Sequence, residues 1–379
     1  MITKPTTSKV PKTTMPKFTQ LKWRIALALP LLLLLLLTLQ TPSHEGPWNA
    51  SHARLPDVQQ HGESVQIQGL RDFRYHVDGR IADARYLEQS FDLAALERVW
   101  LGISHFGKNG LAHTFLSFEF ADGQYLAVSV EARQRPEQSY HPLRGMLRQY
   151  HKIIVLGTEQ DIVGLRSHIR GERVLLYPLQ LDAVQRRHVL QGILADVTEL
   201  AQQPGFYHTL IDNCTTSLLR HDPQHKVWRG LLDYRILLPG HSDAYAVERG
   251  WLEQPRSLSQ LRREAQTNSA IAPTARHFSE RLRQPDYQRL ELSMLVMQAQ
   301  MYDGSAVSTS GVVRGFDDPE HYWLEDNRLN RIALHPKEQA REWLGQRARA
   351  KGRFYYQRDE GRQIQLDELL PLAPQGGQQ

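Results

Sequence analysis

The only cysteine of the chain, Cys214, lies in a sequence that could make it a nucleophile. Asp212 and Asn213 precede it and are favourable N-cap residues, and the Thr-Thr-Ser-Leu-Leu that follows is typical of a first helical turn. A thiol at a helix N-terminus is stabilised as the thiolate, with backbone N–H groups beside it that can hold an oxyanion. The alternative is a small core residue, because free cysteine is among the most buried residue types.

A base for that thiol is predicted on a β-hairpin upstream. Residues 113–120 and 124–131 alternate in polarity and flank Ala-Asp-Gly, a three-residue loop with Gly123 in the left-handed position. One face, expected to join the core, carries Leu116, Phe118, Phe120, Leu126, Val128 and Val130. The other face carries His113, Ser117, Glu119, Ser129 and Glu131. Pairing Phe120 with Gln124 across the loop places His113 opposite Glu131.

His113, Glu131 and Cys214 together could perform thiol catalysis. A thiol nucleophile needs a base within hydrogen-bond reach and a group that orients the base. A carboxylate facing His113 would fix its tautomer and stabilise the imidazolium. On these grounds alone, the catalytic interpretation and the structural one both stand.

The remaining motifs argue against other classes of enzyme. Four histidines in polar or loop-like sequence are expected at the surface: His105, His141, His208 and His221. His221 and His225 have the spacing of a helical metal pair, but Pro223 lies between them and no H-E-x-x-H glutamate is present, so we expect no metal site. The sequence has no G-x-S-x-G elbow and no P-loop, and we expect no cofactor.

Composition and charge narrow the class of protein further. Of the 379 residues, 41% are apolar and 23% are charged, an ordinary globular balance for two or three domains. The net charge of +5 comes partly from the N-terminal tail, so nothing indicates nucleic-acid binding. One cysteine permits no internal disulfide, and an unpaired thiol in an exported protein needs a reason such as catalysis.

The N-terminus predicts export of the main domain. Residues 1–24 are basic, and residues 25–39 form a nearly continuous apolar run. The run contains Pro30 and is shorter than the ~20 residues of a usual spanning helix, yet no A-x-A-like cleavage site follows it. We expect an uncleaved single-pass inner-membrane anchor, with Trp23 and Trp48 at the two interfaces and the main domain in the periplasm. A cleaved signal peptide is the alternative.

The rest of the chain divides into three parts. Residues 40–71 are rich in Pro, His and Gln and are expected to be a linker. Residues 72–255 are expected to form the thiol domain, and residues 256–379 a helical accessory region. Within the thiol domain, patterns predict strand and turn at 72–85, strands at 153–157 and 174–179, and helices at 158–170 and at 182–202, the last capped by Asp182.

Six motifs carry a family resemblance. They are Asp-Phe-Arg-Tyr at 72–75, Ala-His-Thr-Phe-Leu-Ser-Phe at 112–118, Leu-Ala-Val-Ser-Val-Glu-Ala-Arg at 126–133, Pro-Leu-Arg-Gly at 142–145, Asp-Asn-Cys-Thr-Thr at 212–216 and Leu-Pro-Gly-His-Ser-Asp at 238–243. Together they resemble the DUF4105 family, also called the Lnb N-terminal periplasmic domain family, over residues 50–255. The resemblance implies an α+β, circularly permuted papain-like fold related to NlpC/P60 domains. In that fold an antiparallel sheet carries the histidine strand, and this strand precedes the cysteine helix.

The resemblance also assigns roles to residues. Cys214 resembles the nucleophile that accepts the acyl group, His113 the base and Glu131 the group that orients the base. Asn213 and the backbone N–H of Cys214 are expected at the oxyanion site. Two further residues are expected beside this site: Thr215 and Ser117. Two arginines are expected either to meet a phospholipid phosphate or to form surface salt bridges: Arg133 and Arg144.

The name-giving members of the family are lipoprotein N-acyltransferases of Gram-negative bacteria. The implied activity is transfer of a phospholipid acyl chain, through a thioester at Cys214, to an amine of a lipoprotein at the inner membrane. In one departure from the acyltransferase members, no run of membrane spans follows the domain. A cysteine amidase or peptidase of the cell envelope, with water as acceptor, is the second hypothesis. The third is a non-catalytic envelope scaffold in which Cys214 is buried and inert.

Overall fold

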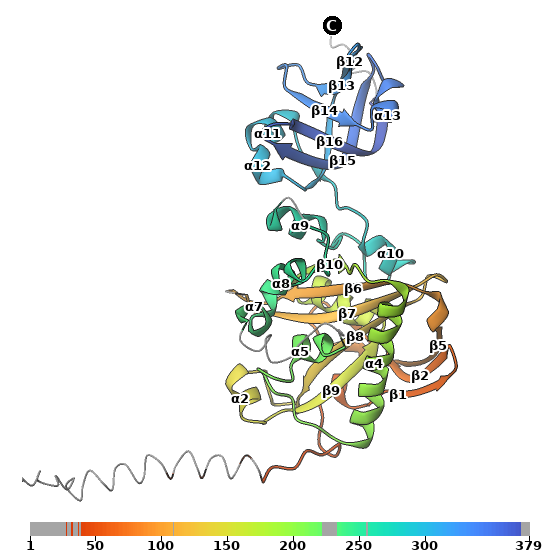
Figure 1. Cartoon of the computed structure of the whole chain (residues 1–379), viewed down its shortest axis with the longest axis vertical. Coiled ribbons are helices and arrows are strands. Elements are labelled where there is room, and N and C mark those ends of the chain that lie inside the picture. Colours follow the sequence, from red (N-terminus) through yellow and green to blue (C-terminus); the bar gives the residue numbers. More distant parts are fainter. Residues whose placement is uncertain are drawn as a thin grey trace, which may run out of the picture.

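The computed structural model describes residues 39–108, 110–221, 233–254 and 257–372, together with Ala28, Leu32 and Leu37. This part of the chain is α+β, as expected, and contains an eight-stranded sheet, a six-stranded sheet and a two-stranded ribbon. Figure 1 shows the eight-stranded sheet in the lower part of the molecule and the six-stranded sheet in the upper part. The expected anchor at 25–39 lies mostly outside the described residues. Within the described residues, no helix has the length and apolar character to cross a membrane.

The large sheet has the strand order β1-β2-β9-β8-β7-β6-β10, and β5 also pairs with β2. Its strands are β1 (Asp57–His61), β2 (Ser64–Arg71), β5 (Tyr86–Asp92), β6 (Leu96–His105), β7 (Ala112–Phe120), β8 (Tyr125–Arg133), β9 (His151–Gly157) and β10 (Arg173–Pro178). The ribbon is β3 (Arg74–Tyr75) with β4 (Ile81–Asp83), and the short 3-10 turns are η1 (Ala50–His52) and η2 (Leu93–Ala95). Within the large sheet, the described strand pairs are antiparallel except for one parallel bridge between β2 and β9.

The predicted hairpin is confirmed in its strands, its loop and its register. Strand β7 pairs with β8 from Leu116 opposite Val128 to Glu119 opposite Tyr125, and this is the register that joining Phe120 to Gln124 requires. Gly123 has a φ of +79°, so the loop uses glycine where a side chain would strain the backbone. The six residues assigned to the core face are all buried.

Helix α4 (Ala183–Gln202) covers the face of the sheet that carries those six residues. The Asp182 side chain accepts a hydrogen bond from the Gln185 N–H, and the Gln185 side chain accepts one from the Asp182 N–H. This capping box starts the helix where the sequence predicts it. Val189, Ile193 and Val197 of this helix pack into the same core cluster as Phe118. This core therefore forms between the alternate apolar residues of β7 and β8 and the apolar stripe of α4.

The opposite face of the sheet is also covered. Helix α3 (Glu159–Gly164) and the π-helical turn η3 (Leu165–Ile169) fill the predicted helix at 158–170, and α10 (Phe278–Leu282) packs beside them. Phe115, Ile162 and Phe278 share one buried cluster here. The face that carries His113, Ser129 and Glu131 is therefore an interior, and its polar groups must find partners within the protein.

Residues 57–71, expected within a linker, form strands β1 and β2 instead. Val65 and Ile67 alternate with polar residues and are 1% and 0% exposed. Gly69 then has a φ of +79°, and the irregularity that it introduces between Gln68 and Leu70 lets Leu70 also face the core. Gln66 and Gln68, two of the glutamines that suggested a linker, alternate with Val65 and Ile67 along β2 and are partly exposed.

The C-terminal region also differs from the expected helical region. Its described residues form a sheet of the order β11-β12-β13-β14-β16-β15, and β12 also pairs with β15, so the sheet closes on itself. The strands are β11 (Gln288–Arg289), β12 (Ala306–Asp317), β13 (Glu320–Glu325), β14 (Arg331–His335), β15 (Arg347–Gln357) and β16 (Gly361–Pro371). The helices that pack on this sheet are α11 (Leu292–Met297), α12 (Ala299–Tyr302) and α13 (Lys337–Arg341). Helix α9 (Leu258–Glu264) packs instead through Leu261 on the cluster of Leu175 and Tyr177 in the large sheet. A separate core that includes Phe354 and Ile364 holds this sheet together.

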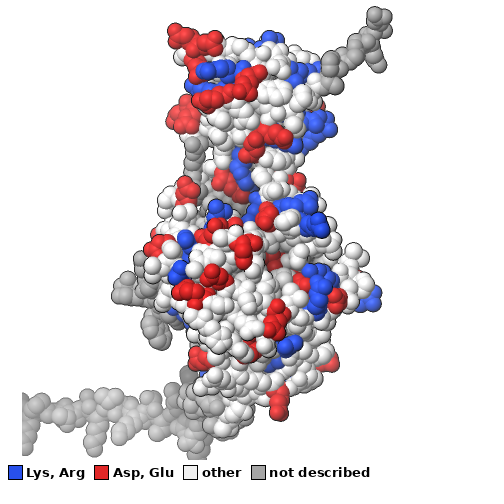
Figure 2. Space-filling model, turned by 90° about the vertical axis from the view of Figure 1, so that its right-hand side faces the viewer, with Lys and Arg blue, Asp and Glu red and all other residues white. Residues whose placement is uncertain are grey.

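The charged residues give no continuous field on the face that Figure 2 presents. Lysine and arginine side chains are interspersed with aspartate and glutamate over both the upper and the lower part. Nucleic-acid binding proteins usually concentrate basic residues on one face. This face therefore offers no surface of that kind.

Candidate functional site

Helix α5 (Cys214–Leu219) begins at the cysteine, as the sequence predicts. Asn213 caps it: its Oδ1 accepts from the Thr215 N–H at 2.8 Å and from the Thr216 N–H at 2.9 Å. In return the Thr216 hydroxyl oxygen accepts from the Asn213 N–H at 2.9 Å. The amide nitrogen of Asn213 donates to the Thr209 carbonyl at 2.6 Å. Asn213 therefore fixes the position of Cys214 with both ends of its side chain.

The start of helix α5 packs against the start of strand β7. The Thr215 hydroxyl, one residue after Cys214, lies 3.0 Å from the Thr114 hydroxyl, one residue after His113. The Cys214 side chain is 4% exposed, and its Sγ lies 3.9 Å from the Thr215 Oγ1. The segments that carry the predicted nucleophile and the predicted base are therefore direct neighbours.

Two phenols flank the cysteine. Burial, followed by the neighbouring Cys214 and Tyr140, raises the pKa of Tyr207 well above its usual value of about 10. The rings of Tyr140 and Tyr207 meet edge to face at 6.1 Å. Because the phenols stay neutral, they surround the thiol with apolar rings and hydroxyl groups and add no charge.

His113 is held by a serine that in turn contacts Glu131. The His113 Nε2 lies 2.7 Å from the Ser129 Oγ, and this hydroxyl donates to the Glu131 Oε1 at 2.8 Å. Ser129 has one proton and gives it to the carboxylate, so it accepts from the Nε2–H of His113. In that tautomer, Nδ1 carries the lone pair and is the atom that could take a thiol proton. Glu131 thus orients His113 through Ser129, a residue that the sequence placed on this face without that role.

Glu131 has two further partners that hold it ionised. His52 contributes its Nε2 at 2.9 Å from Oε2, and Arg166 donates from Nη2 to Oε1 at 3.0 Å. Burial opposes ionisation, but these bonds and charges lower the pKa of Glu131 well below its usual range. Sequence reasoning missed His52 because it lies 79 residues before Glu131, in the segment taken as a linker.

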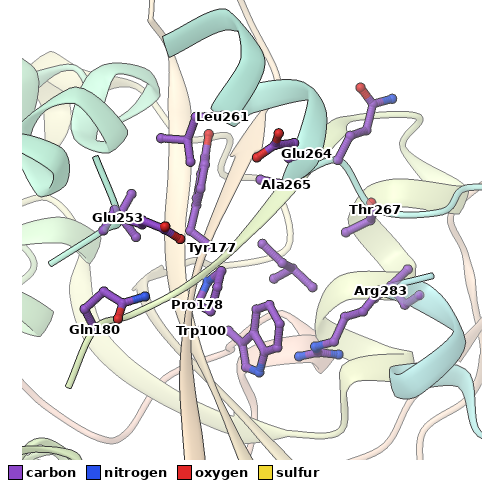
Figure 3. Close-up of a pocket in the computed structure, with 14 residues that line it drawn as sticks. Trp100, Tyr177, Pro178, Gln180, Glu253, Leu261, Glu264, Ala265, Thr267 and Arg283 are labelled. Atoms are coloured by element: carbon purple, nitrogen blue, oxygen red, sulfur yellow. The ribbon is translucent and has the colours of Figure 1, made fainter. Parts of the chain in front are cut away.

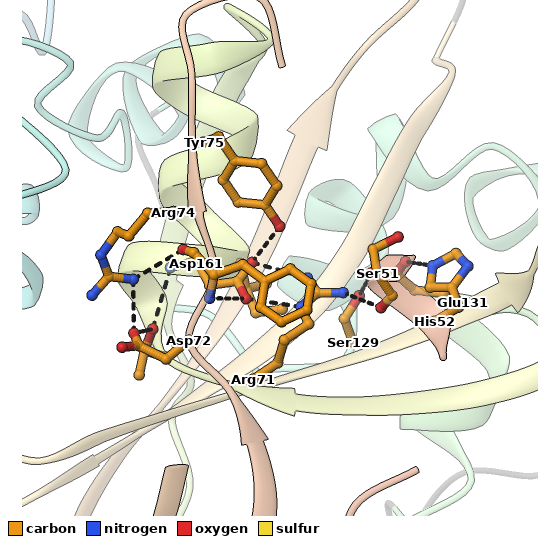
Figure 4. A network of polar contacts seen from close by, with 12 residues as sticks. Ser51, His52, Arg71, Asp72, Arg74, Tyr75, Ser129, Glu131 and Asp161 are labelled. Carbon is orange, nitrogen blue, oxygen red and sulfur yellow. Dashed lines mark hydrogen bonds and ion pairs between the residues drawn. The ribbon is translucent and has the colours of Figure 1, made fainter. Parts of the chain in front are cut away.

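The network continues along the sheet to a buried ion pair (Figure 4). The Arg71 guanidinium donates to both oxygens of Asp161, at 2.8 and 3.0 Å, and its Nη1 donates to the Ser51 carbonyl. Tyr75 donates to Asp161 Oδ1 at 2.9 Å. Arg71 of β2 therefore connects Ser51, the residue before His52, to Asp161 of α3.

No hydrogen bond joins the Cys214 thiol to the His113 ring among the described residues. Successive strand residues point to opposite faces, so Thr114 meets helix α5 while His113 turns toward Ser129. The pairing of β7 with β8 ends at Leu116 opposite Val128, and His113 lies beyond it at the open end of the two strands. Burial, and then the charge of Arg166, lowers the pKa of His113 to about 3, so the ring is neutral at pH 7.

The other predicted site residues are placed elsewhere. Ser117 donates to Glu159, whose carboxylate pairs with Arg283. Arg133 is 2% exposed, donates to the carbonyls of His52 and Ala53 and packs over a tryptophan ring, so it does not reach the surface as a phosphate contact would require. Arg144 is exposed on α2 (Pro142–Met146).

A cavity of about 260 Å³ is lined partly by Arg283, the residue that pairs with Glu159. Figure 3 shows Trp100 and Tyr177 on its sheet side and Leu261 and Arg283 on the helices that close it. None of the residues that line it belongs to the predicted catalytic set. Among the described residues, no cluster of three or more His, Cys, Asp or Glu side chains has the arrangement of a metal site.

These features define a class of domain in which one sheet presents a histidine strand to the start of a cysteine helix. Residues 82–239 match the family described as the Lnb N-terminal periplasmic domain. This segment is therefore similar to that family, whose description names a periplasmic domain. No curated protein and no solved structure matches the chain.

Proposed function

We propose that this chain is a cysteine-dependent acyltransferase of the cell envelope, with a permuted papain-like thiol domain. The observation that carries the proposal is the hydrogen bond between Thr114 and Thr215, which sets the start of the cysteine helix beside the start of the histidine strand. The chain order of these two elements agrees with the order in the permuted fold.

The proposed reaction uses the residues in named roles. The Cys214 thiol attacks the carbonyl carbon of a phospholipid ester, and its proton passes to Nδ1 of His113. The tetrahedral intermediate expels the lysophospholipid alkoxide, which takes that proton, and leaves a thioester on Cys214. An amine, which we propose to be that of a lipoprotein, then attacks the thioester and forms an amide as the thiol is released.

Ser129 and Glu131 support this chemistry by orienting the ring of His113. The ionised carboxylate fixes the serine hydroxyl, and the hydroxyl fixes the tautomer of His113. As the ring gains a proton, the negative charge of Glu131 stabilises the imidazolium.

A non-catalytic envelope scaffold is the second candidate, and two observations favour it. The Cys214 side chain is 4% exposed, and the thiol makes no hydrogen bond to His113 in the described residues. Under that alternative, Cys214 would fill space between Tyr207 and Thr215, and the polar network would only satisfy a buried face.

The test measures release of lysophospholipid from labelled phospholipid by the purified full chain and three variants. Cys214→Ser and His113→Gln should both abolish release, whereas His221→Gln, which alters a histidine paired with Asp196, should retain it. Equal release from the wild type and Cys214→Ser would overturn the proposal. Retained release in His113→Gln would remove His113 as the base. Absence of release together with inertness of Cys214 to alkylation would favour the scaffold.

A further inference from the structure

An apolar patch lies on the surface beside Cys214. It consists of Tyr140, Leu143, Met146 and Ile211, which are 39%, 61%, 38% and 54% exposed. Leu143 and Met146 are three residues apart on α2 and so share one face of this helix. Single exposed apolar residues are ordinary on a protein surface, but four in adjoining segments indicate a contact surface. We call this set the α2 patch.

The α2 patch is connected directly to the cysteine. The Thr209 hydroxyl donates to the Pro142 carbonyl at 2.8 Å, so the turn that carries Ile211 is fixed against α2. The same turn is bonded to Asn213 through the Thr209 carbonyl. Tyr140 extends the patch inward, because its ring packs on Tyr207 next to the thiol. An acyl chain that reached Cys214 from this side would pass over apolar side chains.

The surroundings of the α2 patch are basic. Residues 138–158 contain no aspartate or glutamate, and the chain there carries Arg144 and Arg148. Both arginines are exposed, and neither forms an ion pair with any described residue. Arginine guanidinium groups bind phosphate groups in bidentate fashion, and basic residues beside apolar ones are typical of surfaces that lie on anionic lipid.

The N-terminal chain approaches the same face. Gln40 and Thr41 line a hollow of about 360 Å³ together with Arg148, His151 and Phe206. The apolar run at 25–39 ends directly before these residues in the sequence. A chain held in a membrane by that run would therefore bring this side of the domain to the bilayer surface.

We propose that the α2 patch rests on the membrane surface, with Arg144 and Arg148 on phospholipid phosphates and the apolar side chains among the lipids. The patch then serves as the entry by which a phospholipid acyl ester reaches Cys214. This inference deepens the proposed function, on which its acyl-donor part rests, while the membrane contact itself needs no catalysis.

The test is photocrosslinking of the full chain in vesicles of phosphatidylethanolamine and phosphatidylglycerol that contain a phospholipid with a photoactivatable acyl chain. Peptides that cover 140–148 and 208–212 should be labelled in the wild type. The double variant Leu143→Asp/Met146→Asp should lose at least about tenfold of that labelling, because burial of even one of these two apolar side chains contributes a factor of that order. Labelling of the N-terminal peptides should remain, as the internal measure of membrane association.

A matched control carries two aspartates elsewhere. Met297 and Met301 are 80% and 66% exposed near the C-terminal sheet, so Met297→Asp/Met301→Asp should leave the labelling of 140–148 unchanged. Labelling confined to the N-terminal peptides would overturn the proposal, and so would equal labelling in the Leu143→Asp/Met146→Asp variant. If a second copy covered the patch, labelling would rise as the protein is diluted in lipid, and this would also overturn it.

The outcomes separate the membrane surface from the enzyme. Labelling of the α2 patch in a protein that releases no lysophospholipid would leave the surface standing and remove the acyltransferase. Release of lysophospholipid without labelling of the patch would support the acyltransferase and overturn the membrane surface.

Discussion

Among the single residues of the site, Ser129 holds the central position. This hydroxyl is the link between the carboxylate of Glu131 and the ring of His113. Sequence alternation placed the three side chains on one face, but it could not say that the serine stands between the other two. The spacing along the strands sets the face, whereas side-chain length and rotamer decide which groups meet.

Removal of this link should affect catalysis more than folding. Ser129→Ala should lower kcat for lysophospholipid release by roughly ten- to hundredfold, since a well-placed general base contributes a factor of this order or more. KM should change little, because the serine does not lie at the surface where lipid arrives. Ser129→Thr keeps the hydroxyl and should recover most of the activity. Equal loss in Ser129→Ala and Ser129→Thr, together with a fall in melting temperature, would assign Ser129 a structural role only.

His113 should also make the stability of the protein depend on pH. Burial and Arg166 lower its pKa in the folded state to about 3, with Arg170 acting in the same direction and Glu131 opposing them. In the unfolded chain, the pKa of a histidine is about 6.5. Between these values the unfolded chain binds one more proton, so the free energy of unfolding should fall as pH decreases from about 6.5 toward 3.

Urea denaturation at several pH values over that range checks this expectation. His113→Gln should flatten the decline, because the variant has no group there to protonate on unfolding. The exposed His277 supplies the control, and His277→Gln should keep the slope of the wild type. An identical slope in wild type and His113→Gln would contradict the buried neutral histidine.

At the scale of elements, the cap of helix α5 positions the thiol. Asn213→Ala should lower the free energy of unfolding by about 1 kcal/mol, the usual cost of losing an N-cap side chain. It should also slow alkylation of Cys214 at neutral pH, since the first turn would no longer be fixed. Ser257→Ala removes the cap of α9 in another part of the chain and should cost similar stability without changing alkylation. Equal alkylation rates in the two variants would contradict a positioning role for Asn213.

Local sequence patterns predict an element correctly where the signal lies within the element itself. The hairpin followed from alternation and from Gly123, and α4 from its stripe and its Asp182 cap. The same signal was present but overlooked in β15, where Ala348, Ala350 and Phe354 are buried and alternate with arginine and lysine. From the sequence we instead expect a helical region in this part of the chain. Here the period of two is more informative than composition.

Long-range contacts explain what the sequence could not predict. His52 joins Glu131 because η1 meets β8 in the fold, and Arg71 joins Asp161 across 90 residues because β2 meets α3. Similarly, Ser117 shares a face with the site residues, yet it bonds to Glu159 on a separate element. A hairpin register fixes neighbours across one turn, whereas the rest of a polar network depends on which helix covers the face.

Over the whole molecule, the two large sheets have separate cores, and side-chain hydrogen bonds connect the C-terminal sheet to α9. Arg353 of the C-terminal sheet donates to the carbonyls of Gly304 and Glu264, the latter at the end of α9. The cysteine, the histidine network and the α2 patch all belong to the N-terminal sheet and its helices. The proposed chemistry and the proposed membrane contact therefore lie in one part of the molecule, and neither involves the C-terminal sheet.

The central claim is that Cys214 accepts an acyl group from a phospholipid. The most direct measurement is the intact mass of the full chain after incubation with phospholipid and acid quenching, followed by mapping of the modified peptide. We expect one added acyl mass on the peptide that contains Cys214, lost on treatment with neutral hydroxylamine and absent from Cys214→Ser. An unmodified Cys214 in a protein that has bound the phospholipid, or an adduct that persists in Cys214→Ser, would contradict it.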